Sequence, residues 1–481
     1  MRARKKDVNI GRYLAVFLSA GAVLASRFSI RFTQEQVRLY IALMMAYAWI
    51  GILLLYARMY YDLYVFEPLS FVSAIYIAVF VVKPLIDLRA GHMIEHSIDV
   101  SGGGLKATLI LILSYTALYI GYYLTYDASG RNDLSQLPDI ESGEEYDTIS
   151  LYIVWGITFS LCLLCMFSQG LSLRYIFSLG KTGEVTVSDS NTALLFLSNF
   201  VVTMYTVWML ILFRTSGWAG KLLISILTVV YLIMRNSRWL ILAFILGPVT
   251  YFYAKNRKRP RGIYLLQIAA VSLLLFAWMQ ANRAVLASGG AVQGWGKGGF
   301  TLEKLLAPFE SDLNTYRAFF SMVNRYPARY SYLLGVSYIY VFILFVPRVL
   351  WKGKPDNPVR KIIEHSLNGR ARRSGTAVSN IGEIYANFGV AGCVLIMFLI
   401  GRLLAFLKTF FMSSKEDDLI LYSVMFPLLF QWVARGNFSG NFFVTIFAIL
   451  PFIGKKYLCR RRNGKRRRET AWYQPGFRRK L

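Results

Sequence analysis

Long apolar runs separated by short polar segments are the dominant pattern of this chain. About twenty apolar residues cross the hydrocarbon core of a bilayer as a helix, and many of the runs approach that length. Backbone polar groups inside lipid must be satisfied within the segment, so such runs are expected to be helical. The pattern therefore predicts an all-α, polytopic integral membrane protein with about twelve transmembrane helices. The predicted spans are residues 12–28, 37–56, 66–85, 105–125, 149–168, 192–213, 219–234, 238–254, 263–281, 381–408, 418–433 and 438–454.

The spans divide the chain into four parts. Residues 1–281 form an N-terminal transmembrane bundle of about nine spans, and residues 381–454 form the C-terminal transmembrane helices. Between them lies a large loop, 282–380, and after them a basic tail, 455–481. The apolar run 331–346 within the loop is interpreted as a re-entrant or interfacial helix, because a single extra crossing would place the tail on the other side.

Basic segments orient the bundle. The first six residues hold four Lys or Arg, "KNRKRPRG" at 255–262 holds five, and the tail holds twelve against one acidic residue. Cytoplasmic loops of membrane proteins carry such an excess. We therefore expect both termini in the cytoplasm, and the loop 282–380 on the outer face of the membrane.

Composition supports the membrane class, and the charge adds a functional hint. The chain is 56% hydrophobic with a formal net charge of +28. Its cations lie between apolar runs, which favours membrane topology and anionic lipid over nucleic acid. The external loop holds fourteen Lys and Arg against five acidic residues. Either this loop binds an anion, or the rule that Lys and Arg are concentrated in cytoplasmic loops does not apply to it because it is long.

Six external cations are candidates for binding that anion. Arginine grips phosphate oxygens through a planar pair of hydrogen bonds, and a membrane protein that gathers arginine at its outer face suits a lipid-linked diphosphate. The alternative is that each cation anchors a span end at the interface. The candidates are Arg238, Arg283, Arg348, Lys352, Lys354 and Arg435.

Two further patterns carry little chemistry. Cys162 and Cys165 form a C-x-x-C inside an apolar run, where packing is the simpler interpretation. "HMIEH" at 92–96 matches an H-x-x-E-H zinc motif, but it lies in a short loop without a visible third ligand. We expect no metal and no cofactor.

Two neighbouring stretches carry a resemblance to a known family. These are "VPRVLWKGKP" at 346–355 and "SGTAVSNIGEIYANFGVAG" at 374–392, followed by an apolar span. Together with the topology, they resemble the O-antigen and oligosaccharide repeat-unit polymerases, often called Wzy, which are similar to membrane glycosyltransferases of the GT-C type. The local match covers residues 347–392.

The resemblance implies a reaction and its partners. An undecaprenyl-diphosphate-linked oligosaccharide would be transferred onto a second lipid-linked repeat unit at the outer face, by inversion and without metal. The product would be a surface polysaccharide such as O-antigen, capsule or exopolysaccharide. A chain-length regulator and a flippase are the protein partners that it suggests.

We infer roles for the matching residues from their chemistry. Arg348 and Arg238 would bind the diphosphate, and Glu383 would act as a general base on the acceptor hydroxyl. An ion pair of Glu383 with Arg348 or Lys354 remains the alternative. The motif positions that match the family are Arg348, Lys352, Lys354, Pro355, Gly382, Glu383, Tyr385, Asn387, Phe388 and Gly389.

Two rival functions stay open at this point. A flippase or exporter of lipid-linked glycan would also need many spans and cations, but it should show internal repeats and broken helices, and neither is visible. An O-antigen ligase shares the architecture and resembles a pattern with an external histidine. His365 lies in the loop, but it does not complete that pattern.

Overall fold

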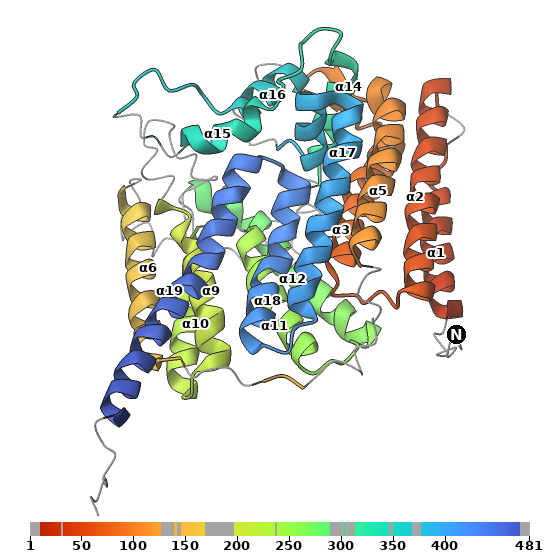
Figure 1. Ribbon diagram of the computed structural model, residues 1–481. Coiled ribbons are helices and arrows are strands. Elements are labelled where there is room, and N and C mark those ends of the chain that lie inside the picture. Colours follow the sequence, from red (N-terminus) through yellow and green to blue (C-terminus); the bar gives the residue numbers. More distant parts are fainter. Residues whose placement is uncertain are drawn as a thin grey trace, which may run out of the picture.

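The structure is a computed structural model that describes residues 10–29, 32–126, 139–141, 146–168, 197–235, 238–288, 301, 305, 313–344, 346, 350–367 and 377–471. These residues form a bundle of helices (Figure 1). The helices are α1 Ile10–Ala25, α2 Gln34–Tyr60, α3 Pro68–Ile77, α4 Lys83–Ala90, α5 Gly104–Tyr126, α6 Thr148–Ser168, α9 Phe200–Arg214, α10 Trp218–Met234, α11 Arg238–Lys255, α12 Gly262–Ser288, α14 Thr315–Arg325, α15 Val336–Leu344, α16 Pro358–Leu367, α17 Asn380–Phe411, α18 Glu416–Phe430 and α19 Phe438–Ala471.

Short elements complete the described chain. The π-helical turns Ala78–Val82 and Gln431–Arg435 join α3 to α4 and extend α18. A 3-10 turn, Ser101–Gly103, precedes α5. The strands β1 (Ile94–Glu95) and β2 (Ile98–Asp99) pair antiparallel in a small hairpin.

The predicted spans are helical over most of the residues that the structure describes, apart from 26–28, 66–67 and 198–199. Among the described residues, seven helices are long and apolar enough to cross a membrane: Gln34–Tyr60, Pro68–Ala90, Ser101–Leu124, Thr148–Met166, Gly262–Met279, Asn380–Phe411 and Glu416–Arg435. Four shorter apolar helices are Tyr13–Ala25, Phe200–Arg214, Trp218–Ile233 and Phe438–Gly454. The remaining segment, α11, has 18 residues with a cation at each end. The prediction of an all-helical, polytopic membrane protein is confirmed.

The bundle has two distinct ends. We call the end that carries α14, α15 and α16 the cap end, and the opposite end the tail end. Figure 1 shows the start of α1 and the far end of α19 together at the tail end. There, Glu416 at the start of α18 binds Arg214 and accepts a bond from Lys255 Nζ (2.6 Å). The start of α1 and the far end of α19 therefore lie at one end of the bundle, and the cap lies at the other.

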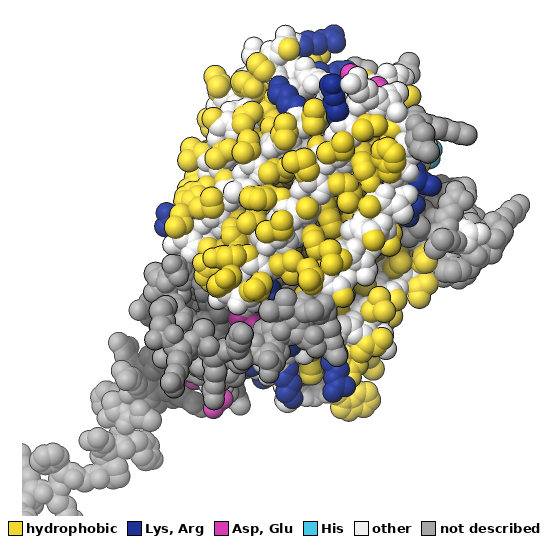
Figure 2. Space-filling model, turned by 90° about the vertical axis from the view of Figure 1, so that its right-hand side faces the viewer, with side chains coloured by type: hydrophobic (Ala, Val, Ile, Leu, Met, Phe, Trp, Pro, Cys, Tyr) yellow, Lys and Arg dark blue, Asp and Glu magenta, His cyan; other side chains and the backbone are white. Residues whose placement is uncertain are grey.

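The surface between these ends suits lipid. Figure 2 shows hydrophobic side chains over the middle of one face, with Lys and Arg gathered towards its two ends. Large apolar side chains are exposed on the transmembrane helices, for example Leu395 (62%) and Leu403 (62%) on α17. In water such a surface would aggregate, whereas in a bilayer it is solvated by acyl chains.

Close packing of α5 against α17 fixes the helix that carries the candidate base. A Cβ added to Gly121 would lie 2.1 Å from the Phe398 carbonyl oxygen, and one added to Gly401 would lie 2.1 Å from that of Leu118. The two backbones therefore touch, which small residues permit between membrane helices. This contact holds α17 in register and places its first turn at the cap end.

The run at 331–346 does not cross the bundle. Its helix, α15, has nine residues and is about 14 Å long, which is less than half the thickness of a hydrocarbon core. Figure 1 shows α15 and α16 lying over the end of the bundle. This part of the chain therefore covers the cap end.

Candidate active site

Glu383 lies in the first turn of α17, at the cap end. Ser379 has extended backbone dihedrals, and its hydroxyl accepts a bond from the Gly382 backbone N–H (3.3 Å), which begins the helix. A carboxylate in the first turn is favoured by the partial positive charge of a helix N-terminus. The "SNIGE" segment therefore encodes a capped helix start with Glu383 in its first turn.

The Glu383 carboxylate is bound mainly by backbone. Its side chain is 1% exposed, and its Oε2 accepts a bond from the Phe438 backbone N–H at the start of α19 (2.9 Å). The Asn437 amide and the Ser337 hydroxyl also lie near the carboxylate. Within the described chain, Oε1 has no hydrogen-bond partner. Glu383 thus joins three elements, and its second oxygen is buried with no hydrogen-bond partner among the described residues.

Asn387, one turn further along α17, clamps the entry to α15. Its Oδ1 accepts from the Gly335 backbone N–H (3.1 Å), and its Nδ2 donates to Ser337 Oγ (2.9 Å) and to the Glu383 carbonyl oxygen (2.7 Å). The Leu334 N–H also donates to the Asn387 carbonyl (3.0 Å). The motif asparagine therefore holds α15 beside the Glu383 turn.

Gly389 and Tyr385 shape the same helix. Gly389 has φ 66° and ψ −155°, which kinks α17, and a Cβ there would lie 2.8 Å from the Tyr332 hydroxyl. Only glycine adopts this conformation readily. The Tyr385 hydroxyl donates to the Tyr326 carbonyl oxygen (3.1 Å) and so attaches α14 to α17. Both motif residues have a structural task.

The first basic motif lies in the connection between α15 and α16. Lys354 is 4% exposed, and its Nζ donates to the carbonyls of Leu344 (3.1 Å) and Val346 (2.9 Å). The Pro355 carbonyl accepts from the Tyr340 hydroxyl (3.1 Å). Lys354 thus caps the end of α15. Lys352 is exposed, and Arg348 lies outside the described residues.

The remaining candidate cations lie on other helices of the bundle. Arg435 ends the π-helical turn after α18, two residues before the Asn437 amide that faces Glu383. Arg238 begins α11, whose other end reaches the tail end, so Arg238 lies towards the cap end. Arg283 lies within α12, and its side chain is outside the described part. The structure therefore places Arg435, Glu383, Asn387 and the loop that carries Pro355 close together.

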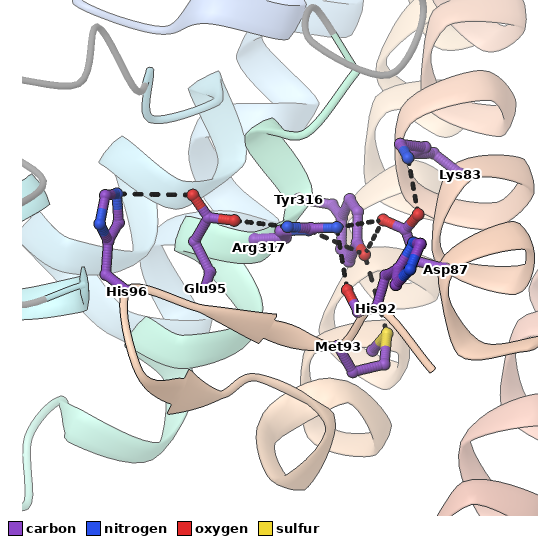
Figure 3. A network of polar contacts seen from close by, with 8 residues as sticks. All are labelled: Lys83, Asp87, His92, Met93, Glu95, His96, Tyr316 and Arg317. Atoms are coloured by element: carbon purple, nitrogen blue, oxygen red, sulfur yellow. Dashed lines mark hydrogen bonds and ion pairs between the residues drawn. The ribbon is translucent and has the colours of Figure 1, made fainter. Parts of the chain in front are cut away.

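A charged network at the cap end was missed from the sequence (Figure 3). Asp87, 2% exposed, accepts from Lys83 Nζ (2.6 Å), from Arg317 Nη2 (2.8 Å) and from the Tyr316 hydroxyl (2.6 Å). Arg317 also binds Glu95 of the hairpin. Two cations are thus balanced by two carboxylates. Because they come from α4, α14 and β1, they attach the cap helix α14 to the bundle.

This network also explains the "HMIEH" pattern. The His92 carbonyl accepts from Arg317 (2.9 Å), and His96 Nε2 lies 3.5 Å from Glu95 Oε1. Among the described residues, no group of three or more His, Cys, Asp and Glu could hold a metal. The signal that could have revealed the network is Lys83 inside a predicted span, four residues before Asp87, since a charge there needs a partner.

His365 is part of the packing between α14 and α16. Its Nδ1 lies 2.8 Å from the Tyr326 hydroxyl, and its ring stacks on Tyr330 at 3.8 Å between centroids. Burial, and then the charge of Lys361, lower the pKa of His365 below its usual range. The imidazole is therefore neutral at pH 7 and joins two cap helices.

The two cysteines of the C-x-x-C pattern are buried in α6. Cys162 is 0% and Cys165 4% exposed. The interpretation of this pair as packing agrees with their burial.

One comparison with known proteins identifies the family. The family model described as O-antigen polysaccharide polymerase Wzy matches residues 14–463, which is most of the chain. No curated protein and no solved structure matches it. The family polymerises lipid-linked repeat units and consists of membrane glycosyltransferases. With its polytopic helical bundle and its motif residues at one end, this chain belongs to the Wzy family of O-antigen polysaccharide polymerases.

Proposed function

We propose that this polymerase joins undecaprenyl-diphosphate-linked repeat units at the outer face of the bacterial cell membrane. A hydroxyl of the acceptor unit attacks the anomeric carbon at the reducing end of the donor glycan. The new glycosidic C–O bond forms as the bond from that carbon to the diphosphate breaks, with inversion. Undecaprenyl diphosphate leaves with the bonding electrons, and the hydroxyl proton passes to a base.

The observation that carries this proposal is the buried Glu383 carboxylate with Oε1 unbonded within the described chain. A carboxylate held in place with one unbonded oxygen suits a general base. Negative charge grows on the leaving diphosphate, so fixed cations nearby would stabilise the transition state. We assign that role to Arg348, Arg435, Arg238, Arg283 and Lys352.

Lys354 takes a different place in this scheme. Its ammonium group donates to two carbonyl oxygens, so it supports the end of α15, which precedes Arg348 in the sequence. The reaction as proposed uses no metal, no cofactor and no nucleotide sugar, because the energy comes from the glycosyl–diphosphate bond.

The orientation of the bundle follows from its charges. Three strongly basic segments adjoin, in the sequence, helix ends that lie at the tail end: the N-terminal segment before α1, residues 255–262 after α11, and the tail that continues α19. We infer that this end faces the cytoplasm. The cap then faces outwards. On α15, Ile339 (57%) and Phe342 (73%) are exposed, which suits an interfacial helix in the outer leaflet. A chain-length regulator and a flippase are the proposed protein partners.

Deleting the gene tests the function. If the protein is the polymerase, the deletion strain should carry surface glycan with single repeat units in place of a series of longer chains. Accumulation of repeat units on the cytoplasmic side, with none at the surface, would instead indicate a flippase.

A further inference from the structure

The connection between α18 and α19 has an unusual backbone. Gly436 has φ 59° and ψ −140°, and the next residue, Asn437, has φ 60°. Positive φ is uncommon for residues other than glycine and persists where the surroundings hold it. A Cβ on Gly436 would lie 2.0 Å from the Val378 carbonyl oxygen, so the connection packs directly against the chain that enters α17. Arg435 immediately precedes this strained pair.

The helix that follows this connection is capped from another helix. The first backbone N–H groups of a helix have no acceptor within it, and a side chain just before the helix commonly accepts one of them. Here Phe438, the first residue of α19, donates to Glu383 Oε2 (2.9 Å), a carboxylate 55 positions away in α17. The carboxylate also suits the partial positive charge of that helix end.

Other side chains close the connection from the α19 and α16 sides. Asn441 Nδ2 donates to the carbonyls of Gln431 (3.2 Å) and Gly436. Asn357, just before α16, donates to Asn437 Oδ1 (3.4 Å). These contacts are made by amide side chains, whereas the Glu383 carboxylate joins α17 to the first backbone amide of α19.

We propose that Glu383 is a positioning residue for Arg435. Its Oε2 caps α19 and fixes the connection 435–438, while Oε1 is left for the acceptor hydroxyl. One oxygen of this carboxylate thus acts as the general base, and the other fixes the connection that carries a diphosphate-binding arginine. The assignment of Arg435 to the diphosphate rests on the proposed function, but the cap itself does not.

Two substitutions separate the roles of the two oxygens. In Glu383→Gln the amide oxygen can still accept from the Phe438 N–H, so the cap remains while the base is lost. In Glu383→Met the side chain keeps a similar length but has no comparable acceptor, so both are lost. Asp356→Ala removes an exposed carboxylate of the loop before α16 and serves as the control.

Hydrogen exchange on the purified, full-length protein measures how well the amides at the start of α19 are protected, independently of enzyme activity. We expect peptides that cover residues 436–441 to exchange roughly tenfold faster or more in Glu383→Met, because the Phe438 amide loses its hydrogen-bond acceptor. Glu383→Gln and Asp356→Ala should exchange like the wild type. Unchanged exchange in Glu383→Met would overturn the proposal, and so would faster exchange in Glu383→Gln.

Steady-state kinetics with a lipid-linked repeat unit as substrate test the link to Arg435. Glu383→Gln should lower kcat with KM near the wild-type value, while Glu383→Met should also raise KM, as Arg435→Ala should too. Combining Glu383→Met with Arg435→Ala should raise KM little beyond either change alone, because both act on one contact. Additive effects would overturn the link. If the wild type forms no polymer while the exchange pattern holds, the proposed function fails and the cap stands.

Discussion

Changing Asp87 to Asn should destabilise the cap strongly. Asp87 accepts hydrogen bonds from Lys83, Tyr316 and Arg317 at 2.6–2.8 Å in a buried site. The charges of Lys83, Arg317, Asp87 and Glu95 sum to zero (two positive, two negative), and the substitution leaves the cluster at +1. Removing one partner of a buried ion pair typically costs about 3–5 kcal/mol. We expect a loss of that size in the free energy of unfolding.

Restoring neutrality gives a sharper test of the same network. Adding Lys83→Met to Asp87→Asn leaves the Arg317–Glu95 pair, so the double variant should regain much of the lost stability. Unfolding in mixed detergent micelles, followed by circular dichroism, would give each free energy and the coupling between the two sites. The exposed Asp356→Asn should change stability by less than about 0.5 kcal/mol. If Asp87→Asn matches that control, the reasoning is refuted.

Three further changes probe the site and its orientation. Gly389→Ala should cost about 1–3 kcal/mol of stability in thermal unfolding, because a φ of 66° disfavours a Cβ, which would also meet Tyr332. Gly454→Ala is the control, since a Cβ there would have no heavy atom within 4 Å. Equal melting temperatures for the two variants would contradict this prediction. Arg348→Ala should abolish polymerisation at normal protein level, and Arg348→Lys should rescue it poorly, since an ammonium cannot form the two-bond fork; full activity with lysine would mean that charge alone suffices. In a variant without its four native cysteines, Lys361→Cys should react with an impermeant thiol reagent in intact cells, and Asn256→Cys should react only after lysis. Labelling of Asn256→Cys in intact cells, with Lys361→Cys labelled only after lysis, would invert the proposed topology.

The helical plan of the fold could be predicted from the sequence because it depends on local patterns. Apolar runs of span length gave each apolar helix of span-like length a predicted counterpart, since each such run must satisfy its own backbone in lipid, whereas the cap helices α14 and α16 had no predicted counterpart. Nine residues in α15 likewise agree with a segment that does not cross. The first turn of α17 was also readable, because Ser379 and Glu383 are an ordinary helix start.

The contacts of the site could not be predicted, because they join residues distant in the chain. Glu383 is bound by an amide 55 positions away, and Arg317 meets Asp87 across 230 positions. No local pattern specifies such pairs. The basic motif shows the same limit, because Lys354 looks like a ligand-binding cation in the sequence but bonds to the carbonyls that end α15.

Reconstitution with a defined substrate tests the central claim most directly. The purified protein in proteoliposomes, given undecaprenyl-diphosphate-linked repeat units and a chelator, should form a ladder of longer glycans and release undecaprenyl diphosphate. The Arg435→Ala protein should form far less. Movement of intact repeat units across the bilayer without any increase in glycan length would contradict the account.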